Sequence, residues 1–558
     1  MINTLKGNGP KQFGIHLGLT ILAALLFAGA FPNLLVENGI PLLAWAAYIP
    51  VFILIRQVNL AASIFWGALY GYAAYGLFNY WLSVFHPLAG LIVGCIYLVY
   101  VAILFFFLKL AGILFPKRAY LVQWIIWIGY EYLRTQGFLG YSYGITGYSQ
   151  WRQVPLIQIA GIFGVWGVSA LVVFPSAWLG AAWGNLTSST IAEKRTLWRL
   201  ALFVTEMGRA ALDFFRRETI AACVWLAALI AALVFGLVSP RDFSAYPSVN
   251  IALIQHNTDP WKGGIDEYRR NYEILRRLSS EALAAEPRPG LVVWPETAFV
   301  PRIYWHETYR DDPASWALIR ELLDYLAAQD VPFVIGNDDA RKDPAKNPNA
   351  REDYRVDYNA VMLYEKGKNT GLYRKLHLVP FTEHFPYRKQ FPAIYQALVN
   401  ADTHFWEKGT EATVFSGPGF KFSTPVCFED TFGYLSRDFV RNGAELIVNL
   451  SNDAWSRSLP AQNQHLAMAV FRAVENQRSM VRSTASGQTC GITPDGKIIA
   501  LAPPFREAWI TVAIPVVAGN TVYTRYGDFL GIGCAAASGF LLIAGAALCI
   551  IKRKKERK

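Results

Sequence analysis

The sequence predicts a polytopic helical membrane domain of about eight spans and an α/β domain inserted before the last span. Three observations lead to this prediction. First, 53% of the 558 residues are hydrophobic and only 17% are charged. Second, long uncharged runs fill the part of the chain before Pro240 and return once near the end. Third, short apolar runs alternate with helical patterns between Pro240 and Asp528. Hydrophobicity this high also excludes a disordered chain.

A membrane span requires about 20 apolar residues. The runs that reach or approach this length are Phe13–Pro32, Asn38–Ile55, Val58–Phe85, Pro87–Leu108, Ala119–Tyr130, Val154–Asn185, Thr219–Ser239 and Phe529–Ile551. The fifth run is the shortest and continues into Glu131 and Arg134. One such run is also typical of a buried core helix, but so many in one chain indicate membrane spans.

The distribution of Lys and Arg predicts the orientation of these spans. Basic residues gather near the N-terminus, after the second, fourth and sixth runs, and in the tail Lys552–Lys558, whereas the alternate loops nearly lack them. If all eight runs span, both termini face the cytoplasm and residues 240–528 face the other side. The net charge of +11 lies mostly in these flanks, so it indicates contact with anionic lipid and not nucleic-acid binding. The basic, amphipathic segment Ala192–Glu218 is expected to be a cytoplasmic helix, solvated or lying along the interface.

Residues 240–528 have the alternation of strands and helices that indicates an α/β layered fold. The expected strands are Val249–Gln255, Gly290–Trp294, Pro332–Gly336, Asn359–Tyr364, Gly371–Leu378, Lys421–Cys427, Glu445–Leu450 and, last among three or four closing strands, Ala508–Ile514. The expected helices are Asp266–Glu286, Pro313–Gln329, Gly433–Asn442 and Gln464–Gln477.

Three of these strand ends carry reactive side chains, which are Glu296, Lys375 and Cys427. Each alone has a structural explanation: a capping carboxylate, a solvated lysine and a small buried thiol. Together they supply the parts of nucleophilic catalysis. A cysteine needs a base to form a thiolate, and a carboxylate of raised pKa can act as that base. An ammonium group can hold the oxyanion that forms when the thiolate attacks a carbonyl.

The order Trp294-Pro-Glu296, Lys375 and Cys427-Phe-Glu429 resembles the nitrilase (carbon–nitrogen hydrolase) superfamily. That resemblance implies a nitrilase-like αββα sandwich and a Glu-Lys-Cys triad. With its predicted spans, the chain is similar over nearly its whole length to the apolipoprotein N-acyltransferase family of Gram-negative inner membranes. Further matching motifs are Glu131-Tyr-Leu-Arg134, Gly147–Gln150, Pro380–Glu383, Ser451–Trp455, Gln464-His465 and Arg482–Thr484.

The resemblance implies that Cys427 is the nucleophile, Glu296 the general base and Lys375 the oxyanion stabiliser. The only other cysteine in residues 240–528 is Cys490. An oxidising periplasm permits a Cys427–Cys490 disulfide, but that bond would silence the nucleophile, so we expect free thiols. We expect no cofactor. The histidines show no paired ligand spacing, so the sequence predicts no metal site.

The resemblance also places supporting residues around the site. Glu383 would support Lys375, Glu429 would lie near the triad, and Trp261 would belong to a mobile loop at the lipid entrance. Surface carboxylates and a packed indole are the structural alternatives. Phe428 stands where the family frequently has Tyr, so a hydrogen bond from that position is lost. Two further departures, expected to affect the pocket rim and substrate loops, are Ser456 and Ala485.

The implied reaction transfers an acyl chain from a membrane phospholipid to the N-terminal α-amine of diacylglyceryl-cysteine in apolipoproteins. It would pass through a Cys427 thioester in a ping-pong scheme. The resemblance implies a multi-pass protein of the cell inner membrane. Residues 1–239 would carry seven spans, residues 240–528 would be the catalytic domain in the periplasm, and residues 529–558 would form the last span and a cytoplasmic tail. Phospholipid donor and diacylglyceryl apolipoprotein acceptor are the expected partners.

Alternative functions follow from the same features. A membrane-tethered nitrilase-type amidase would pass its acyl group to water with the same triad. A transporter or receptor would need polar or broken spans, and charges other than Glu131 and Arg134 are nearly absent from the runs. A catalytically inactive binding module would not need Glu296, Lys375 and Cys427 together.

Overall fold

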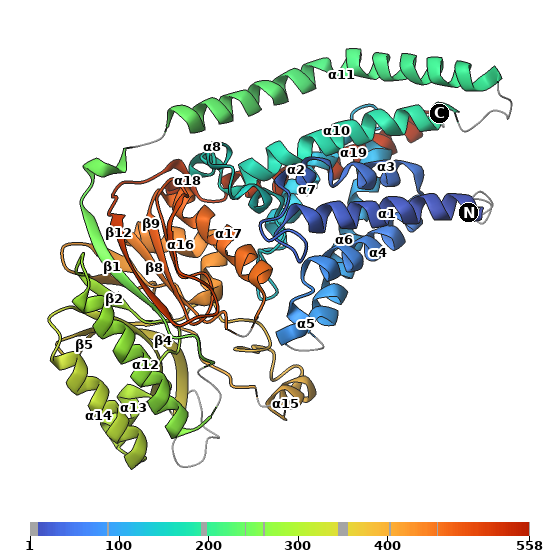
Figure 1. Cartoon of the computed structure of the whole chain (residues 1–558). Coiled ribbons are helices and arrows are strands. Elements are labelled where there is room, and N and C mark those ends of the chain that lie inside the picture. Colours follow the sequence, from blue (N-terminus) through green and yellow to red (C-terminus); the bar gives the residue numbers. More distant parts are fainter. Residues whose placement is uncertain are drawn as a thin grey trace. The chain divides into compact units, whose positions relative to one another are not determined.

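Figure 1 shows a computed structural model of the chain, which describes residues 9–85, 89–190, 198–239, 242–259, 263–343, 355–400, 403–454 and 456–556. The chain divides into two compact units. Unit 1 consists of Met1–Ser239 and Asp528–Lys558, and unit 2 consists of Pro240–Gly527. The two segments of unit 1 are therefore separated in sequence by the whole of unit 2.

In its described residues, unit 1 is built from helices. They are α1 (Pro10–Ala30), α2 (Pro41–Ala46), α3 (Ile49–Gln57), α4 (Leu60–Phe78), α5 (Leu82–Phe85), α6 (Ala89–Leu114), α7 (Ala119–Leu133), η1 (Thr146–Gln150), α8 (Val154–Ile157), α9 (Ala160–Phe163), α10 (Val165–Thr190), α11 (Trp198–Val238) and α19 (Phe529–Glu556). Five helices of the described part are long and apolar enough to cross a membrane: α1, α6, α10, α11 and α19.

The other three expected spans take different forms. The run Asn38–Ile55 is divided into α2 and α3, each with a proline in its first turn. The run Val58–Phe85 forms the 19-residue α4 and the short α5, and the run Ala119–Tyr130 lies within the 15-residue α7. The count of eight spans therefore stays a prediction. Helix α11 is continuous over 41 residues, so it joins the seventh run to most of the expected amphipathic helix.

The surface of unit 1 is apolar. Large hydrophobic side chains are exposed on α1, α4, α6, α11 and α19, and within α19 the buried residues are Gly531 and Gly545. Soluble proteins rarely expose contiguous apolar patches of this extent. This surface is therefore suited to lipid.

Helices α4 and α6 pack closely because α4 presents glycines to α6. A Cβ atom on Gly71 would lie 2.3 Å from the Tyr97 carbonyl oxygen, and one on Gly67 would lie 2.7 Å from the Phe105 Cβ atom. Small residues at such contacts let helix backbones approach, as is common between membrane helices. These glycines therefore fix how the two helices meet.

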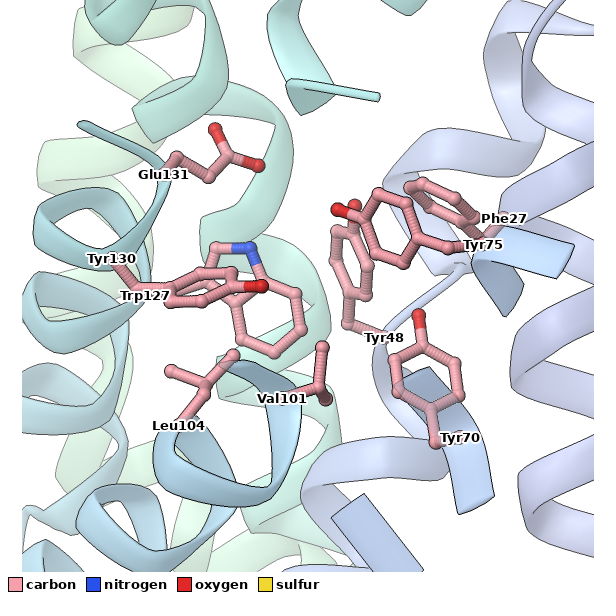
Figure 2. Close-up of a pocket in the computed structure, with 9 residues that line it drawn as sticks. All are labelled: Phe27, Tyr48, Tyr70, Tyr75, Val101, Leu104, Trp127, Tyr130 and Glu131. Carbon is pink, nitrogen blue, oxygen red and sulfur yellow. The ribbon is translucent and has the colours of Figure 1, made fainter. Parts of the chain in front are cut away.

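Glu131 and Arg134, the two charges expected near the fifth run, are both buried. The Glu131 carboxylate accepts hydrogen bonds from the Thr146 backbone N–H (3.0 Å) and hydroxyl (2.5 Å). The Arg134 Nη1 donates to the carbonyls of Tyr141 (3.0 Å) and Tyr143 (2.9 Å). Glu131 and Arg134 therefore hold the segment that connects α7 to η1 against the end of α7. Figure 2 shows the Glu131 side chain beside a small pocket whose other lining residues are Phe27, Tyr48, Tyr70, Tyr75, Val101, Leu104, Trp127 and Tyr130.

The described residues of unit 2 form two six-stranded sheets. The first has the order β12-β1-β2-β3-β4-β5, and the second has the order β11-β10-β9-β8-β7-β6. Their strands are β1 (Ser248–Gln255), β2 (Leu291–Val293), β3 (Phe333–Lys342), β4 (Arg355–Glu365), β5 (Lys368–Arg374), β6 (Val414–Ser416), β7 (Lys421–Ser423), β8 (Leu446–Ser451), β9 (Ser479–Thr484), β10 (Cys490–Ile492), β11 (Ile498–Leu501) and β12 (Ala508–Pro515). Strands β1, β2 and β3 run parallel, as do β7, β8 and β9.

The two sheets face each other and helices cover their outer faces (Figure 1). The Ser483 hydroxyl on β9 donates to the carbonyls of Ile254 on β1 (2.9 Å) and Val293 on β2 (3.1 Å). The helices of unit 2 are α12 (Ile265–Ala284), α13 (Ile303–Tyr309), α14 (Pro313–Ala327), α15 (Pro392–Asn400), α16 (Gly433–Arg441), α17 (Leu459–Asn476) and α18 (Val522–Tyr526). A core of buried apolar side chains joins α12 and α14 to the first sheet. The arrangement is the expected αββα sandwich.

Several elements differ from their expected bounds. The expected strand Lys421–Cys427 ends at Ser423, and Cys427 instead begins a 3-10 turn, η3 (Cys427–Thr431). The expected strand Gly371–Leu378 ends at Arg374, so Lys375 lies directly after it. Strands β3 and β4 are about twice as long as expected. The sequence predicts shorter strands because polar residues, which are buried in the structure, interrupt the apolar pattern.

Candidate active site

The topology brings Glu296 and Lys375 to one edge of the first sheet. Strand β2 ends shortly before Glu296, and β5, which ends at Arg374, runs in the same direction because two antiparallel pairings separate it from β3. Carboxyl ends of strands with the same direction meet at one edge of a sheet. The Lys375 Nζ atom lies 3.2 Å from Glu296 Oε1, and both side chains are buried.

Two groups orient the Glu296 carboxylate. Asn359 on β4 donates its side-chain N–H to Glu296 Oε1 (2.9 Å), and the Asn452 backbone N–H donates to Glu296 Oε2 (2.9 Å). Asn452 follows β8, so Glu296 is held by groups from both sheets. Together with Lys375, these donors hold the carboxylate in one orientation.

Lys375 is shared between two carboxylates. Its Nζ atom donates to Glu383 Oε1 at 2.9 Å, while Glu383 Oε2 accepts from the Val379 backbone N–H at 2.8 Å. Burial acts against the ammonium charge, but Glu296 and Glu383 outweigh it and raise the pKa of Lys375 well above its ordinary value. Burial, opposed by Lys375, raises the pKa of Glu383. Glu383 therefore contacts Lys375 directly and is not a surface carboxylate. Lys375 keeps its positive charge.

Cys427 is the reactive residue that the second sheet contributes. It begins the turn η3, which follows strand β7. Its backbone has φ +50, a left-handed conformation that non-glycine residues seldom adopt. Burial and the charge of Glu296 raise the pKa of the Cys427 thiol well above its ordinary value, although Lys375 acts to lower it. The resting group is therefore a thiol that needs a base. Both Cys427 and the buried Cys490 have free thiols.

Glu429 connects the nucleophile turn to the lysine loop. Its carboxylate accepts backbone N–H groups of Val426 (2.7 Å), Leu376 (2.7 Å) and His377 (2.9 Å), and also the Tyr373 hydroxyl (2.8 Å). Burial, opposed by these donors and by Lys375, raises the pKa of Glu429 to about 7. Because Val426 precedes Cys427 and Leu376 follows Lys375, Glu429 joins the backbone segments that carry the two reactive groups.

The remaining predicted site residues have different outcomes. Phe428 is buried and its ring packs against Phe432 (4.9 Å between centroids) and His377 (5.8 Å). The Phe428 ring is therefore part of an aromatic cluster. The hydroxyl that a tyrosine would carry at this position is absent. Trp261, expected at the lipid entrance, lies outside the described residues.

The two further departures from the family pattern both contact the end of β8 and the loop that follows it. The Ser456 hydroxyl donates to the Asp453 carbonyl (3.0 Å), and the Ala485 backbone N–H donates to the Ser451 carbonyl (3.0 Å). Neither replaces a contact to the triad side chains.

The structure brings to the site several residues that sequence reasoning missed. The sequence predicts Asn359 only as the first residue of a strand, whereas in the structure its side chain donates a hydrogen bond to Glu296. Asp430, Asp453, His465 and Arg482 form a buried ionic cluster beside Cys427. Asp453, His465 and Arg482 lie in motifs on which the family resemblance rests, and this was the one sign of their importance in the sequence. Their contacts could not be predicted, because the partners are far apart in the sequence.

A thiol with a buried carboxylate and a buried ammonium, on a two-sheet α/β sandwich, defines a cysteine enzyme of the carbon–nitrogen hydrolase class. The carbon–nitrogen hydrolase family matches residues 250–521, and the apolipoprotein N-acyltransferase N-terminal domain matches residues 23–178. The chain belongs to the apolipoprotein N-acyltransferase family, which confirms the family resemblance of the sequence.

Three relatives illustrate the extent of the similarity. The chain is 43% identical to apolipoprotein N-acyltransferase 1 of Treponema denticola, over 98% of both chains. It is 45% identical to apolipoprotein N-acyltransferase 1 of Treponema pallidum, over 94% of this chain and 95% of the relative. It is 30% identical to apolipoprotein N-acyltransferase of Geobacter metallireducens, over 93% of each.

Proposed function

We propose that this protein transfers an acyl chain from a membrane phospholipid to the N-terminal α-amine of diacylglyceryl-cysteine in apolipoproteins. Family membership over nearly the whole chain supports this substrate pair. The observation that supports the chemistry is the set Cys427, Glu296 and Lys375. The Glu296 carboxylate and the Lys375 ammonium are 3.2 Å apart, and both are buried. Apolar helices of unit 1 would keep the enzyme in the inner membrane, with unit 2 in the periplasm.

The first half-reaction would load the enzyme. Glu296 takes the proton from the Cys427 thiol as Sγ attacks the ester carbonyl of the phospholipid. The Lys375 ammonium stabilises the oxyanion of the tetrahedral intermediate. The intermediate then expels the lysophospholipid alkoxide, to which Glu296 returns the proton. A thioester on Cys427 and a free lysophospholipid result.

The second half-reaction would transfer the acyl chain. The α-amine of diacylglyceryl-cysteine attacks the thioester carbonyl, and Glu296 accepts a proton from that amine. Lys375 again stabilises the oxyanion. Collapse expels the Cys427 thiolate, which regains a proton from Glu296, and an amide bond is left on the lipoprotein. Because the lysophospholipid leaves an acyl-enzyme before the acceptor reacts, the kinetics would be ping-pong.

Mass spectrometry of the acyl-enzyme tests this proposal. The purified protein is incubated with phospholipid, and the Cys427 peptide is expected to gain the mass of one acyl chain. A diacylglyceryl-cysteine peptide added next is expected to remove that mass and become N-acylated. Cys427→Ala is expected to form no adduct, whereas Cys490→Ala, the matched cysteine control, is expected to form it.

Two results would contradict the proposal. An adduct that persists in Cys427→Ala would place the nucleophile elsewhere. An adduct lost to water as fast as to the peptide would instead identify the amidase that the same triad could form.

A further inference from the structure

A cluster of four charged side chains lies buried beside the nucleophile turn. We call Asp430, Asp453, His465 and Arg482 the His465 cluster. The His465 Nε2 atom lies 2.6 Å from Asp430 Oδ1, and its Nδ1 atom lies 3.3 Å from Asp453 Oδ1. Arg482 approaches the other oxygens of the same carboxylates, at 3.4 Å and 3.8 Å. All four side chains are at most 5% exposed.

The cluster joins the two segments that place the nucleophile and the base. Asp430 belongs to η3, three residues after Cys427. Asp453 follows Asn452, whose backbone N–H binds Glu296. His465 comes from α17 and Arg482 from β9, so both cations belong to regular elements that hold the two segments. The Ser451 hydroxyl, which donates to Asp453 Oδ1 at 3.1 Å, also contacts the Cys427 thiol.

The cluster is electrically neutral only when His465 is protonated. Two carboxylates then face two cations, whereas a neutral imidazole would leave one uncompensated negative charge in a buried site, which is costly. Burial lowers the pKa of His465 and Arg482 lowers it further, but Asp430 and Asp453 outweigh both and raise it to about 9. Besides these groups, the Cys427 and Cys490 thiols also act on Arg482.

We propose that His465 is a positioning residue for the acyl-transfer reaction, in which its ring, hydrogen-bonded at both nitrogens, joins the Cys427 turn to the loop that orients Glu296. The inference rests on the proposed function for its reaction, although the geometry of the cluster is independent of the substrate. Loss of the positive charge would let the Cys427 turn and the Asn452 segment separate. It would also leave a negative charge beside the Cys427 thiol and thus disfavour its ionisation.

Alkylation of Cys427 by iodoacetamide tests the inference without phospholipid. The rate is followed on the Cys427 peptide by mass spectrometry in four variants. H465Q leaves the cluster one negative charge in excess and is expected to slow alkylation about tenfold, the effect of about one unit of thiol pKa. D430N is expected not to slow it. The double variant D430N/H465Q restores neutrality and is expected to react within about threefold of the unchanged protein. H306Q, at a histidine paired with Asp311 outside the cluster, is the matched control.

Acyl-transfer kinetics give the second measurement. H465Q is expected to lower kcat by about ten- to a hundredfold while the KM for phospholipid changes little, because binding is unaffected and the reacting groups are misplaced. A histidine with a packing role alone would make both single variants slow and the double variant slower still, and that result would overturn the inference. So would an H465Q enzyme with unchanged alkylation.

Controls separate the remaining outcomes. If H465Q does not yield folded protein, the neutral double variant must still fold and alkylate normally; its failure overturns the inference. If the unchanged protein acylates no peptide, the proposed function fails while the alkylation series still decides the role of His465.

Discussion

At the scale of single residues, the site is built around one buried ammonium. Lys375 pairs with both Glu296 and Glu383, and of these two carboxylates Glu296 is the one whose charge acts on the Cys427 thiol. The raised pKa of the thiol means that little thiolate exists before substrate arrives. Proton removal and attack must therefore be coupled, which makes the placement of Glu296 more important than the resting acidity of the cysteine.

Glu383→Gln tests the supporting role of the second carboxylate. The amide would keep one acceptor oxygen but turn a donor toward either Lys375 or the Val379 N–H, leaving a buried donor without its acceptor. We expect the free energy of unfolding to fall by about 1–3 kcal/mol. We also expect kcat to fall by about tenfold or more, because the Lys375 ammonium shifts from the oxyanion. Glu365→Gln, at an exposed position on β4, is the control, and normal kcat in Glu383→Gln would contradict the role.

His465 predicts how stability depends on pH. Its pKa in the folded protein is about 9, above its ordinary value of 6.5. A pKa raised by folding gives stability that is complete below pH 6.5 and is lost as pH rises through 9. The loss is on the order of 3 kcal/mol across that window. Thermal unfolding of the purified protein from pH 6 to 10 measures it, and His465→Gln should flatten that part of the profile; an equal slope in both proteins would refute the assignment.

At the scale of elements, the sequence predicted the alternation of strands and helices but not the local geometry of the nucleophile. The apolar pattern through Val426 suggested a strand up to Cys427, whereas the chain turns there with φ +50, held by the Glu429 contacts. Such a turn depends on partners that are distant in sequence, so no local pattern reveals it. The full lengths of β3 and β4 escape prediction for a similar reason, since buried Asp338 and Asp357 look like surface residues until their partners are known.

Gly71→Ala tests the packing of α4 on α6. The added Cβ would lie 2.3 Å from the Tyr97 carbonyl oxygen, so the two helices must separate. Overpacking of this kind costs about 1–3 kcal/mol, which we expect to lower the thermal midpoint in detergent by about 3 °C or more. Gly76→Ala is the matched control on the same helix, because nothing lies within 4 Å of its Cβ position. We expect it to match or exceed the unchanged protein, and equal midpoints for both variants would contradict the packing argument.

At the scale of the whole molecule, the number of crossings before unit 2 decides where catalysis takes place. Among the described residues, four of the five long apolar helices precede unit 2, and four crossings would leave the N-terminus and unit 2 on the same side. The seven crossings expected from the charge pattern would put them on opposite sides. Whether unit 2 faces the periplasm therefore depends on whether three further segments cross the membrane: α2–α3, α4 and α7.

Cysteine labelling distinguishes these arrangements. In a background with the exposed Cys95 and Cys223 replaced by Ser, Lys11→Cys and Lys368→Cys each add one exposed thiol, near the N-terminus and on β5 of unit 2. With a membrane-impermeant maleimide and right-side-out vesicles, we expect labelling of Lys368→Cys and not of Lys11→Cys. Inside-out vesicles should give the reverse. Labelling of both in right-side-out vesicles would show an even number of crossings between them and contradict the cytoplasmic N-terminus. Labelling of both in inside-out vesicles would show the same parity and contradict the periplasmic location of unit 2.

The antiparallel pairing of β1 with β12 has a further consequence. Ser248 lies opposite Pro515, so the first and last strands of unit 2 are neighbours in one sheet. A domain whose ends lie side by side can be inserted into a loop of another protein without stretching either host segment. Unit 2 is therefore suited to insertion between two segments of a host chain, as it is here between α11 and α19. The same feature makes residues 242–527 the natural fragment to express alone or to exchange between relatives.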